Sequence, residues 1–272
     1  MTRNFHRVLC ISLFISFNAL ANEPQRIISL SPHLTELTFA LNSGDKLVAV
    51  SDYSDYPEQA KQLPSVASFQ GVNFEAVMRL KPDLILAWRG GNKPQDLSRL
   101  QSLGFKLFYS SPQKPGDIAD EIEALGESLN QSRRAKTLAA DFRQQLVQIK
   151  NRYSQQTPVS TFYYMWPTPL MTVGPNAWAS KLLNICGATN IFAASPTDYP
   201  EVPMEQVLTR KPQLIIAAQK TNASDIQAFW QKWLPMFSTP RPRIAQVDPD
   251  RLHRFTPRLI NGLNGLCETI HL

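Results

Sequence analysis

The residue types that most often carry acid–base, nucleophilic or metal chemistry are sparse in this chain. Beyond the N-terminal region the histidines are His33, His253 and His271, and no two of them have the close spacing of a zinc site. The short motifs of serine hydrolases, zinc peptidases, P-loops and dinucleotide-binding folds do not occur. Carboxylates and lysines are plentiful, but nothing selects an acid–base pair. The sequence therefore favours binding over catalysis, without a cofactor, and an exported hydrolase using a carboxylate pair stays open as an alternative.

Large apolar side chains, by contrast, gather at the ends of predicted strands and in the loops that follow them. Open α/β sheets place their ligand crevice at this edge, beyond the carboxyl ends of the strands. One such residue is readily explained by packing, but several on matching loops of two half-chains favour a cleft for a flat or bulky apolar ligand. These residues are Tyr53, Tyr56, Phe69 and Trp88 in the first half, and Trp166, Met171 and Tyr199 in the second.

A charged segment, DRLHR at Asp250–Arg254, follows the last predicted strand. It places a carboxylate and two guanidinium groups in one predicted loop. Such groups can hydrogen-bond amides or anionic groups at the rim of a ligand. A solvated charged turn before a helix is the alternative explanation.

One helix-to-strand unit occurs twice in the chain. Residues 74–87 read FEAVMRLKPDLILA and residues 204–217 read MEQVLTRKPQLIIA, 130 positions apart. A period this long is not that of a solenoid, and it predicts two similar lobes. Glu75 and Glu205 open the two repeated helices, where acidic residues complement the helix dipole. Their symmetric placement also offers two carboxylates that a two-fold partner with basic pockets could recognise.

The elements that must position these residues alternate between strand and helix on both sides of one long helical segment. The alternation predicts an α/β fold with mainly parallel sheets. Residues 132–153 have one apolar face, which predicts a helix roughly 33 Å long at about 1.5 Å per residue. A stiff helix, unlike a Gly- or Ser-rich hinge, allows only limited opening. The predicted organisation is a signal peptide at 1–21, an N-terminal lobe at 22–130, an interlobe helix at 131–155 and a C-terminal lobe at 156–272.

The N-terminus has the features of an export signal. Arg3 and Arg7 precede an apolar stretch, residues 8–20, and a small-x-small site follows at residues 19–21. We therefore expect cleavage after Ala21 and an exported mature chain. No later segment has the roughly 20 apolar residues of a spanning helix.

Charge and cysteine content agree with an exported binding protein. The formal net charge is +6, without a basic run or stripe, so nucleic-acid binding is not implied. Removal of the signal takes Cys10 away and leaves Cys186 and Cys267. In an oxidising compartment this pair favours a disulfide, and two buried free thiols are the alternative.

Several longer segments resemble one known family. They are SDYSDYPEQA at 51–60, FQGVNFE at 69–75, KPDLILAWRGGN at 81–92, the ICG that contains Cys186, and the EQVL of the second repeated unit. Together they resemble the periplasmic cobalamin (vitamin B12) binding proteins, which serve an inner-membrane ABC importer. The similarity runs in order over the mature chain, and AWRGGN is specific to this group.

The resemblance implies a class III periplasmic substrate-binding protein fold, in which two α/β lobes joined by one helix hold cobalamin without chemistry. It implies a monomer in the periplasm whose partners are cobalamin and an ABC transporter, namely a permease dimer with its ATPase subunits. In that family the matching cysteines form a disulfide, which supports a Cys186–Cys267 bridge. The matching glutamates dock on the transporter, which assigns docking to Glu75 and Glu205.

The resemblance also implies a set of ligand contacts. Trp is usual in the family where this chain has Phe69 and Tyr199, and Phe is usual where it has Met171, yet each substitute still offers a flat or soft apolar face. The alternative on the same fold is a haem or ferric-siderophore receptor, for which Tyr53 or His33 could be an iron ligand. The implied cobalamin contacts are Tyr53, Phe69, Trp88, Met171 and Tyr199 on the corrin face, and Asp250, Arg251, Leu252, His253 and Arg254 at its rim.

Overall fold

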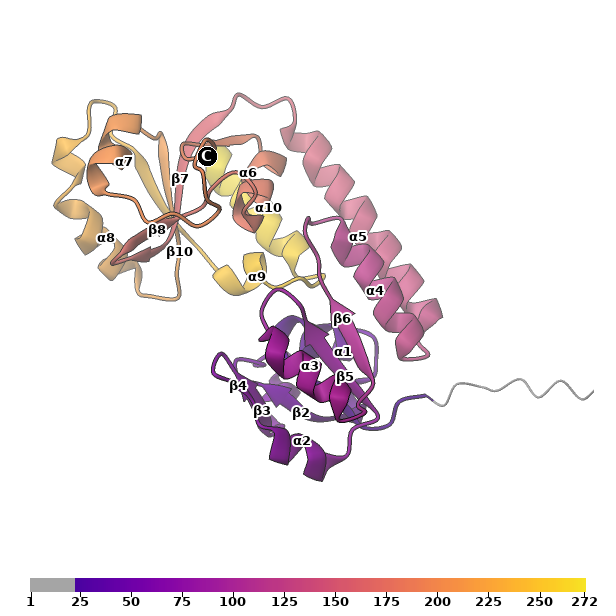
Figure 1. Cartoon of the computed structure of the whole chain (residues 1–272). Helices are drawn as coiled ribbons and strands as arrows, with labels where there is room; N and C mark the ends of the chain where they lie inside the picture. The colour runs from indigo at the N-terminus through magenta and orange to yellow at the C-terminus, as the bar shows by residue number, and fades with distance from the viewer. Residues whose placement is uncertain (1–22) are drawn as a thin grey trace, which may run out of the picture.

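The structure is a computed structural model that describes residues 23–272, so the predicted signal peptide lies outside the described residues. Two α/β lobes are connected along one side by a pair of long antiparallel helices (Figure 1). Among the described residues no helix is both long enough and apolar enough to span a membrane.

The N-terminal lobe contains a six-stranded sheet in the order β4-β3-β2-β1-β5-β6, parallel except for the β3–β4 pair. Its strands are β1 (Ile27–Ser29), β2 (Leu47–Ser51), β3 (Ser65–Ser68), β4 (Gly71–Val72), β5 (Leu84–Trp88) and β6 (Leu107–Ser110). Its helices are α1 (Pro32–Ala40), α2 (Phe74–Leu80), α3 (Pro94–Ser102) and α4 (Asp117–Ser128), with single 3-10 turns at Gly44–Lys46 and Glu58–Gln62.

The C-terminal lobe contains a five-stranded sheet in the order β11-β10-β7-β8, in which β9 also pairs with β7. Only the β7–β8 pair is antiparallel among these strands. The strands are β7 (Val159–Pro167), β8 (Leu170–Thr172), β9 (Ala188–Asn190), β10 (Leu214–Ala218) and β11 (Arg243–Val247). The helices are α6 (Trp178–Ile185), α7 (Met204–Arg210), α8 (Ala223–Gln231), α9 (Pro249–His253) and α10 (Leu259–His271), with a 3-10 turn at Leu234–Met236.

The repeated sequence unit is also a repeated structural unit. The helices α2 and α7 each end at a lysine in the left-handed region, Lys81 with φ 47° and Lys211 with φ 48°. Each lysine is followed by a proline, which cannot continue a helix. The following strands hold the same place, because β5 lies between β1 and β6 as β10 lies between β7 and β11. The prediction of two similar lobes is confirmed.

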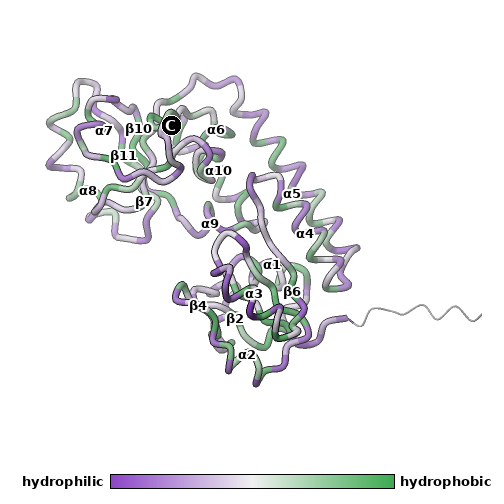
Figure 2. Tube along the Cα trace, in the orientation of Figure 1, coloured by the Kyte–Doolittle hydropathy of each residue, from purple (hydrophilic) through white to green (hydrophobic). Residues whose placement is uncertain are grey.

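The helix α5 (Ser132–Tyr153) occupies the range in which helical spacing predicts it. It packs along α4 in an antiparallel pair and continues onto α6 and α10 of the other lobe (Figure 1). Hydrophobic residues alternate with hydrophilic ones along both helices of this pair (Figure 2). The pair is tight near its turn, because a Cβ at Gly126 would overlap that of Ala135. The α4–α5 pair therefore braces both lobes from one side.

A single hydrophobic cluster extends through both lobes. Alternate residues of a strand face opposite sides of its sheet. Accordingly β5 directs Leu84 and Leu86 into this central cluster and Ile85 and Ala87 into an outer one, and β10 divides its residues in the same way. The central cluster includes buried residues of α4, α5, α6 and α10, whereas each outer cluster belongs to one lobe. The two lobes therefore share part of one hydrophobic core.

Cys186, just after α6, and Cys267, within α10, form a disulfide with their Cα atoms 4.7 Å apart. The prediction of a bridge is confirmed, and the alternative of two free thiols is wrong. The bridge joins two helices of the central cluster within the C-terminal lobe.

Truncation of α5 tests the shared cluster. Phe142 is 1% exposed in this cluster, so Phe142→Ala should lower the free energy of unfolding by about 3–5 kcal/mol. Val147 lies on the same helix but is 56% exposed, so Val147→Ala should change it little. Urea denaturation followed by circular dichroism and by tryptophan fluorescence measures both variants. Because both lobes share the cluster, circular dichroism and tryptophan fluorescence should change over the same range of urea concentration. Two separate transitions would contradict a shared cluster.

Candidate functional site

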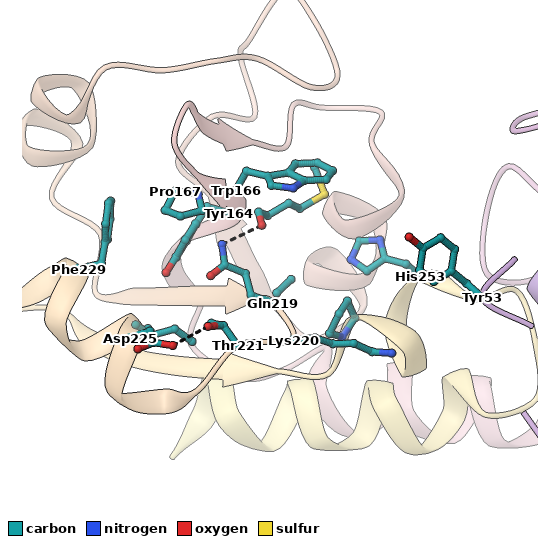
Figure 3. Close-up of a pocket in the computed structure, with 14 residues that line it drawn as sticks. Tyr53, Tyr164, Trp166, Pro167, Gln219, Lys220, Thr221, Asp225, Phe229 and His253 are labelled. Carbon is teal, nitrogen blue, oxygen red and sulfur yellow. Dashed lines mark hydrogen bonds between the residues drawn. The ribbon is translucent and has the colours of Figure 1, made fainter. Parts of the chain in front are cut away.

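A trough of about 860 Å³ lies where the two lobes meet. Its floor is formed by the carboxyl ends of the C-terminal strands, where Ala218 ends β10 and Pro249 follows β11. We call it the C-lobe trough and define it by Tyr164, Trp166, Gln219, Lys220, Phe229 and His253, with Tyr53 reaching in from the N-terminal lobe (Figure 3). This is the edge at which parallel α/β sheets bind ligands.

Three predicted ligand-binding residues have strongly exposed rings on loops or turns. Tyr53 follows β2 in the left-handed region, with φ 62°, and is 77% exposed. Phe69 lies in the turn between β3 and β4 and is 82% exposed, and Tyr199 is 53% exposed. Large apolar rings left in water on both lobes are typical of an interaction site. Of the three, Tyr53 lines the C-lobe trough.

The other two predicted apolar contacts lie on strands. Met171 of β8 pairs with Trp166 of β7, which lines the trough and is 58% exposed. Trp88 ends β5 and is only half-buried, with its ring edge-on to those of His33 and Phe255. Phe255 also packs on Trp178, so these rings connect the two lobes beside the cleft.

The segment Asp250–Arg254, expected to be a loop, is largely helical and forms most of α9. Asp248 caps this helix by accepting a hydrogen bond from the backbone of Asp250 at 2.9 Å, and Pro249 opens it. Helical spacing then sends the five side chains in different directions. Leu252 is 1% exposed in the central cluster, and Arg251 is an exposed partner of Asp248. The structure therefore does not bring these two residues to the trough.

Arg254 crosses to the other lobe instead of lying free at a rim. Its guanidinium donates to Glu36 Oε1 at 2.8 Å and to Asp55 Oδ1 at 2.6 Å, both in the N-terminal lobe. Asp250 lies 3.1 Å from the same guanidinium, and Arg258 donates to Glu36 at 3.1 Å. These five residues form the interlobe ion cluster. The Arg254 side chain is 10% exposed and that of Glu36 only 3%, so these two charges are held away from water, whereas Asp55 is 39% exposed.

The carboxylates of the interlobe ion cluster respond differently to their surroundings. Burial raises the pKa of Glu36, against the opposing effect of Arg254 and Arg258. Burial also acts to raise the pKa of Asp55, but the Arg254 guanidinium and the Lys220 ammonium hold it below its ordinary value. Lys220, at the floor of the trough, is paired with Asp250 and lies 3.9 Å from Asp55. The positive charges near the trough are therefore largely matched by carboxylates.

Neither histidine near the cleft offers a free, charged ring. His33 is 3% exposed, and its two ring nitrogens lie within hydrogen-bonding distance of the hydroxyls of Ser31 and Ser110, at 3.2 Å and 2.8 Å. Burial lowers the pKa of His33 to about 3 and that of His253 to about 4, so both are neutral near pH 7. His253 lines the trough and bonds to the Tyr163 hydroxyl at 2.8 Å. His33 thus has both ring nitrogens within hydrogen-bonding distance of buried hydroxyls and is not among the residues that line the trough.

Sequence reasoning missed Tyr164, Gln219 and Phe229, which form the inner part of the trough. A signal for them exists in the repeat. When the two units are matched, Ala218 at the end of β10 takes the place that Trp88 has at the end of β5. A small residue where the other lobe has an indole indicates open space at that strand end.

Comparison with known proteins agrees with this geometry. Residues 27–236 match the sequence profile of the periplasmic binding proteins. The chain belongs to the periplasmic binding protein family. It is 39% identical over 263 residues to the "Vitamin B12-binding protein" of Vibrio cholerae serotype O1, covering 96% of this chain and 95% of the relative. It is 41% identical over 260 residues to that of Yersinia pseudotuberculosis, covering 95% and 91%.

Solved structures of periplasmic binding proteins have the same fold. The periplasmic vitamin B12 binding protein of Vibrio cholerae matches with a TM-score of 0.83 at 39% identity, covering 91% of this chain and 97% of that one. A periplasmic heme binding protein from Pseudomonas aeruginosa matches with a TM-score of 0.78 at 26% identity, covering 91% and 92%. The expected class III fold is confirmed, and the expectation of a binding protein agrees with the family.

Removal of the central cation tests the interlobe ion cluster. Arg254→Met leaves Glu36 and Asp55 without their shared partner, so the free energy of unfolding should fall by about 3–5 kcal/mol. Arg251→Met, on the same helix, removes an exposed guanidinium and should cost less than about 1 kcal/mol. Chemical denaturation measures both variants. Equal effects would mean that the cluster does not hold the lobes.

Proposed function

We propose that this protein captures cobalamin between its two lobes and delivers it, chemically unchanged, to an inner-membrane ABC transporter. The observation that carries the proposal is the set of exposed large rings on both lobes, at Tyr53, Phe69 and Tyr199, together with an apolar trough that Tyr53 lines at the junction of the lobes. Support comes from the relatives described as vitamin B12-binding proteins, which are 39–41% identical over nearly the whole chain.

The chemistry of cobalamin suits these surroundings. The molecule has a broad apolar ring face with a fringe of amides, so apolar walls can desolvate the face while polar groups meet the fringe. Burial contributes on the order of 25 cal/mol per Å² of apolar area before ordering costs. The interlobe ion cluster and α5 already fix the lobes, so little free energy is needed to order the site. We therefore expect tight cobalamin binding with only a small movement of the lobes.

The organisation of the chain supports capture in the periplasm and delivery to a transporter. We propose a signal peptide at 1–21 that is removed in the periplasm, an N-terminal lobe at 22–130, an interlobe helix at 131–155 and a C-terminal lobe at 156–272. Glu75 and Glu205 are exposed at the starts of α2 and α7, the equivalent helices of the two lobes. Two carboxylates on equivalent elements suit docking to two copies of one basic pocket, as in a permease dimer.

Ligand titration tests the proposed cargo. Cyanocobalamin should quench the tryptophan fluorescence of the purified protein at a lower concentration than haemin or a ferric siderophore. Phe69→Ala and Tyr199→Ala should each weaken cobalamin binding by about 1–3 kcal/mol, because each removes a large apolar contact. Leu103→Ala, an exposed apolar residue after α3, serves as the control and should bind normally. Tighter binding of haemin than of cyanocobalamin would contradict cobalamin as the cargo and favour haem, the alternative on this fold.

Charge removal at the docking helices tests delivery separately from capture. Glu75→Ala combined with Glu205→Ala should leave cobalamin affinity unchanged and abolish stimulation of transport in a reconstituted importer. Glu127→Ala, an exposed carboxylate on α4, is the matched control. Normal transport by the double variant would remove the docking role and leave the capture role standing.

A further inference from the structure

The last strand of the C-terminal sheet has one side without a partner strand. In the part of the chain that the structure describes, β11 pairs only with β10, at the end of the order β11-β10-β7-β8. The N–H of Arg243 donates to the carbonyl of Gln213 at 3.0 Å, so the backbone groups of Arg243 face β10. Backbone groups point to alternate sides along a strand, so those of Ile244 and Gln246 point away from the sheet. The outer side of β11 therefore offers the hydrogen-bonding groups that a further strand uses.

The sequence of β11 does not guard this edge. Natural sheets commonly guard an edge with a proline inside the strand, a charge that points outward or a bulge. The sequence of β11, RIAQV, contains no proline, and its register with β10 is unbroken over the whole strand. Its one charged side chain, Arg243, donates to the carbonyls of Thr269 and Ile270 at the end of α10, at 3.2 Å and 2.9 Å. The backbone of β11 therefore remains suited to pairing with a further strand.

A hollow lies beside β11 on each face of the sheet. Among the described residues β11 is the one strand that lines either of them, so both lie at its edge. The hollow toward α8 has a volume of about 550 Å³, and the hollow toward α10 has about 300 Å³. We call them the α8 hollow, whose lining includes Ile226, Gln227, Leu234 and Ile244, and the α10 hollow, whose lining includes Asn261, Gly262, Gly265 and Thr269.

The two hollows differ in chemistry, and together they predict the side chains of an added strand. Successive side chains of a strand point to opposite faces, so they enter the two hollows in turn. The apolar side chains of Ile226, Leu234 and Ile244 make the α8 hollow suited to a large apolar side chain. The α10 hollow is smaller, and a Cβ at Gly265 would meet no atom within 4 Å. It is therefore suited to a small polar side chain.

Three cations stand around the start of β11 without an ion pair. Arg243 begins the strand, Arg241 is exposed two residues before it, and Lys232 is exposed just after α8. Among residues 23–272 none of these three cations lies within 4.0 Å of a carboxylate oxygen. Beyond the other end of β11 the guanidinium of Arg251 is paired with Asp248. The unmatched positive charge at the start of the strand is complementary to an acidic partner.

We propose that the edge of β11 binds an extended segment of another protein, which pairs with Ile244 and Gln246 as a sixth strand of the C-terminal sheet. The segment alternates large apolar with small polar side chains, and its end beside Lys232 and Arg241 is acidic. Main-chain hydrogen bonds supply affinity, and the two hollows and the cations supply specificity. None of the described residues that line the C-lobe trough belongs to β11, so this partner and a cargo can be bound together.

Model peptides test the proposed strand addition. A fluorescein-labelled peptide alternates isoleucine with threonine and carries two aspartates at one end. Versions with the aspartates at the amino or the carboxyl end cover parallel and antiparallel addition. Fluorescence anisotropy with the purified protein should show saturable binding of at least one version. Methylation of one alternate set of its backbone nitrogens should abolish that binding, and methylation of the other set should not. Lysines in place of the aspartates should weaken binding about tenfold or more.

Variants of the protein locate the site. Lys232→Glu combined with Arg241→Glu should weaken binding of the aspartate peptide about tenfold or more, because it reverses the charge beside the start of β11. Gly265→Leu should have a similar effect, because it fills the α10 hollow where a Cβ meets open space. Arg133→Glu combined with Lys136→Glu reverses two exposed charges on α5 and is the matched control. Circular dichroism verifies that each variant is folded.

The outcomes separate this site from the proposed function. Peptide binding that both edge variants weaken and the α5 variant does not would support the site. Failure of both peptides to bind the wild-type protein, or equal binding by edge and control variants, would overturn it. Self-association of the wild-type protein in sedimentation velocity, lost in Gly265→Leu, would assign the edge to a second copy of this chain instead. Cyanocobalamin binding should be the same in all these variants, so loss of the edge site leaves the proposed function intact.

Discussion

The cleft depends on a buried charge contact between the lobes. The guanidinium of Arg254 lies between Glu36 and Asp55 of the opposite lobe and is almost enclosed. A small displacement that breaks these pairs without admitting water leaves buried charges unpaired, which costs several kcal/mol. A larger opening must also disturb the central cluster around α5. Small relative movements of the lobes are therefore costly, which favours a cleft whose width is set before a ligand arrives.

The two lobes repeat one architecture but differ where a ligand would touch them. The α2–β5 and α7–β10 units share their helix ends, strand neighbours and alternation of buried residues. They differ at the last strand position, where the first lobe has the indole of Trp88 and the second has the small side chain of Ala218, which lines the trough. Trp88 packs on Phe255 beside the interlobe ion cluster, whereas Ala218 permits the trough. A duplicated scaffold thus has one strand end that packs against the other lobe and one that leaves an open trough.

Much of the fold follows from local pattern, because burial on one face imposes a period on the sequence. The apolar spacing of α5 predicts its range, and the repeated unit predicts the paired lobes. The partners of Arg254 could not be predicted in this way, since Glu36 and Asp55 are 218 and 199 positions away in sequence. The local pattern of DRLHR shows only charge, although the Asp248-Pro249 pair before it is a helix-start signal that the loop assignment overlooked. The inner part of the trough likewise depends on how α8 packs against the C-terminal sheet, where it contacts β11, and no local pattern contains this.

If the cleft is formed before the ligand binds, capture requires little movement of the lobes, and the free energy of opening must be supplied when the ligand is released. If Glu75 and Glu205 dock as proposed, the transporter holds both lobes and can pull them apart. The central cluster and the interlobe ion cluster both resist this separation of the lobes, and they respond differently to water. The central cluster loses apolar burial without compensation when it opens, whereas the groups of the interlobe ion cluster regain hydration once water enters. Opening should therefore occur where α9 meets α1, with the α4–α5 pair as the pivot, so that the cleft widens on the side opposite the paired helices.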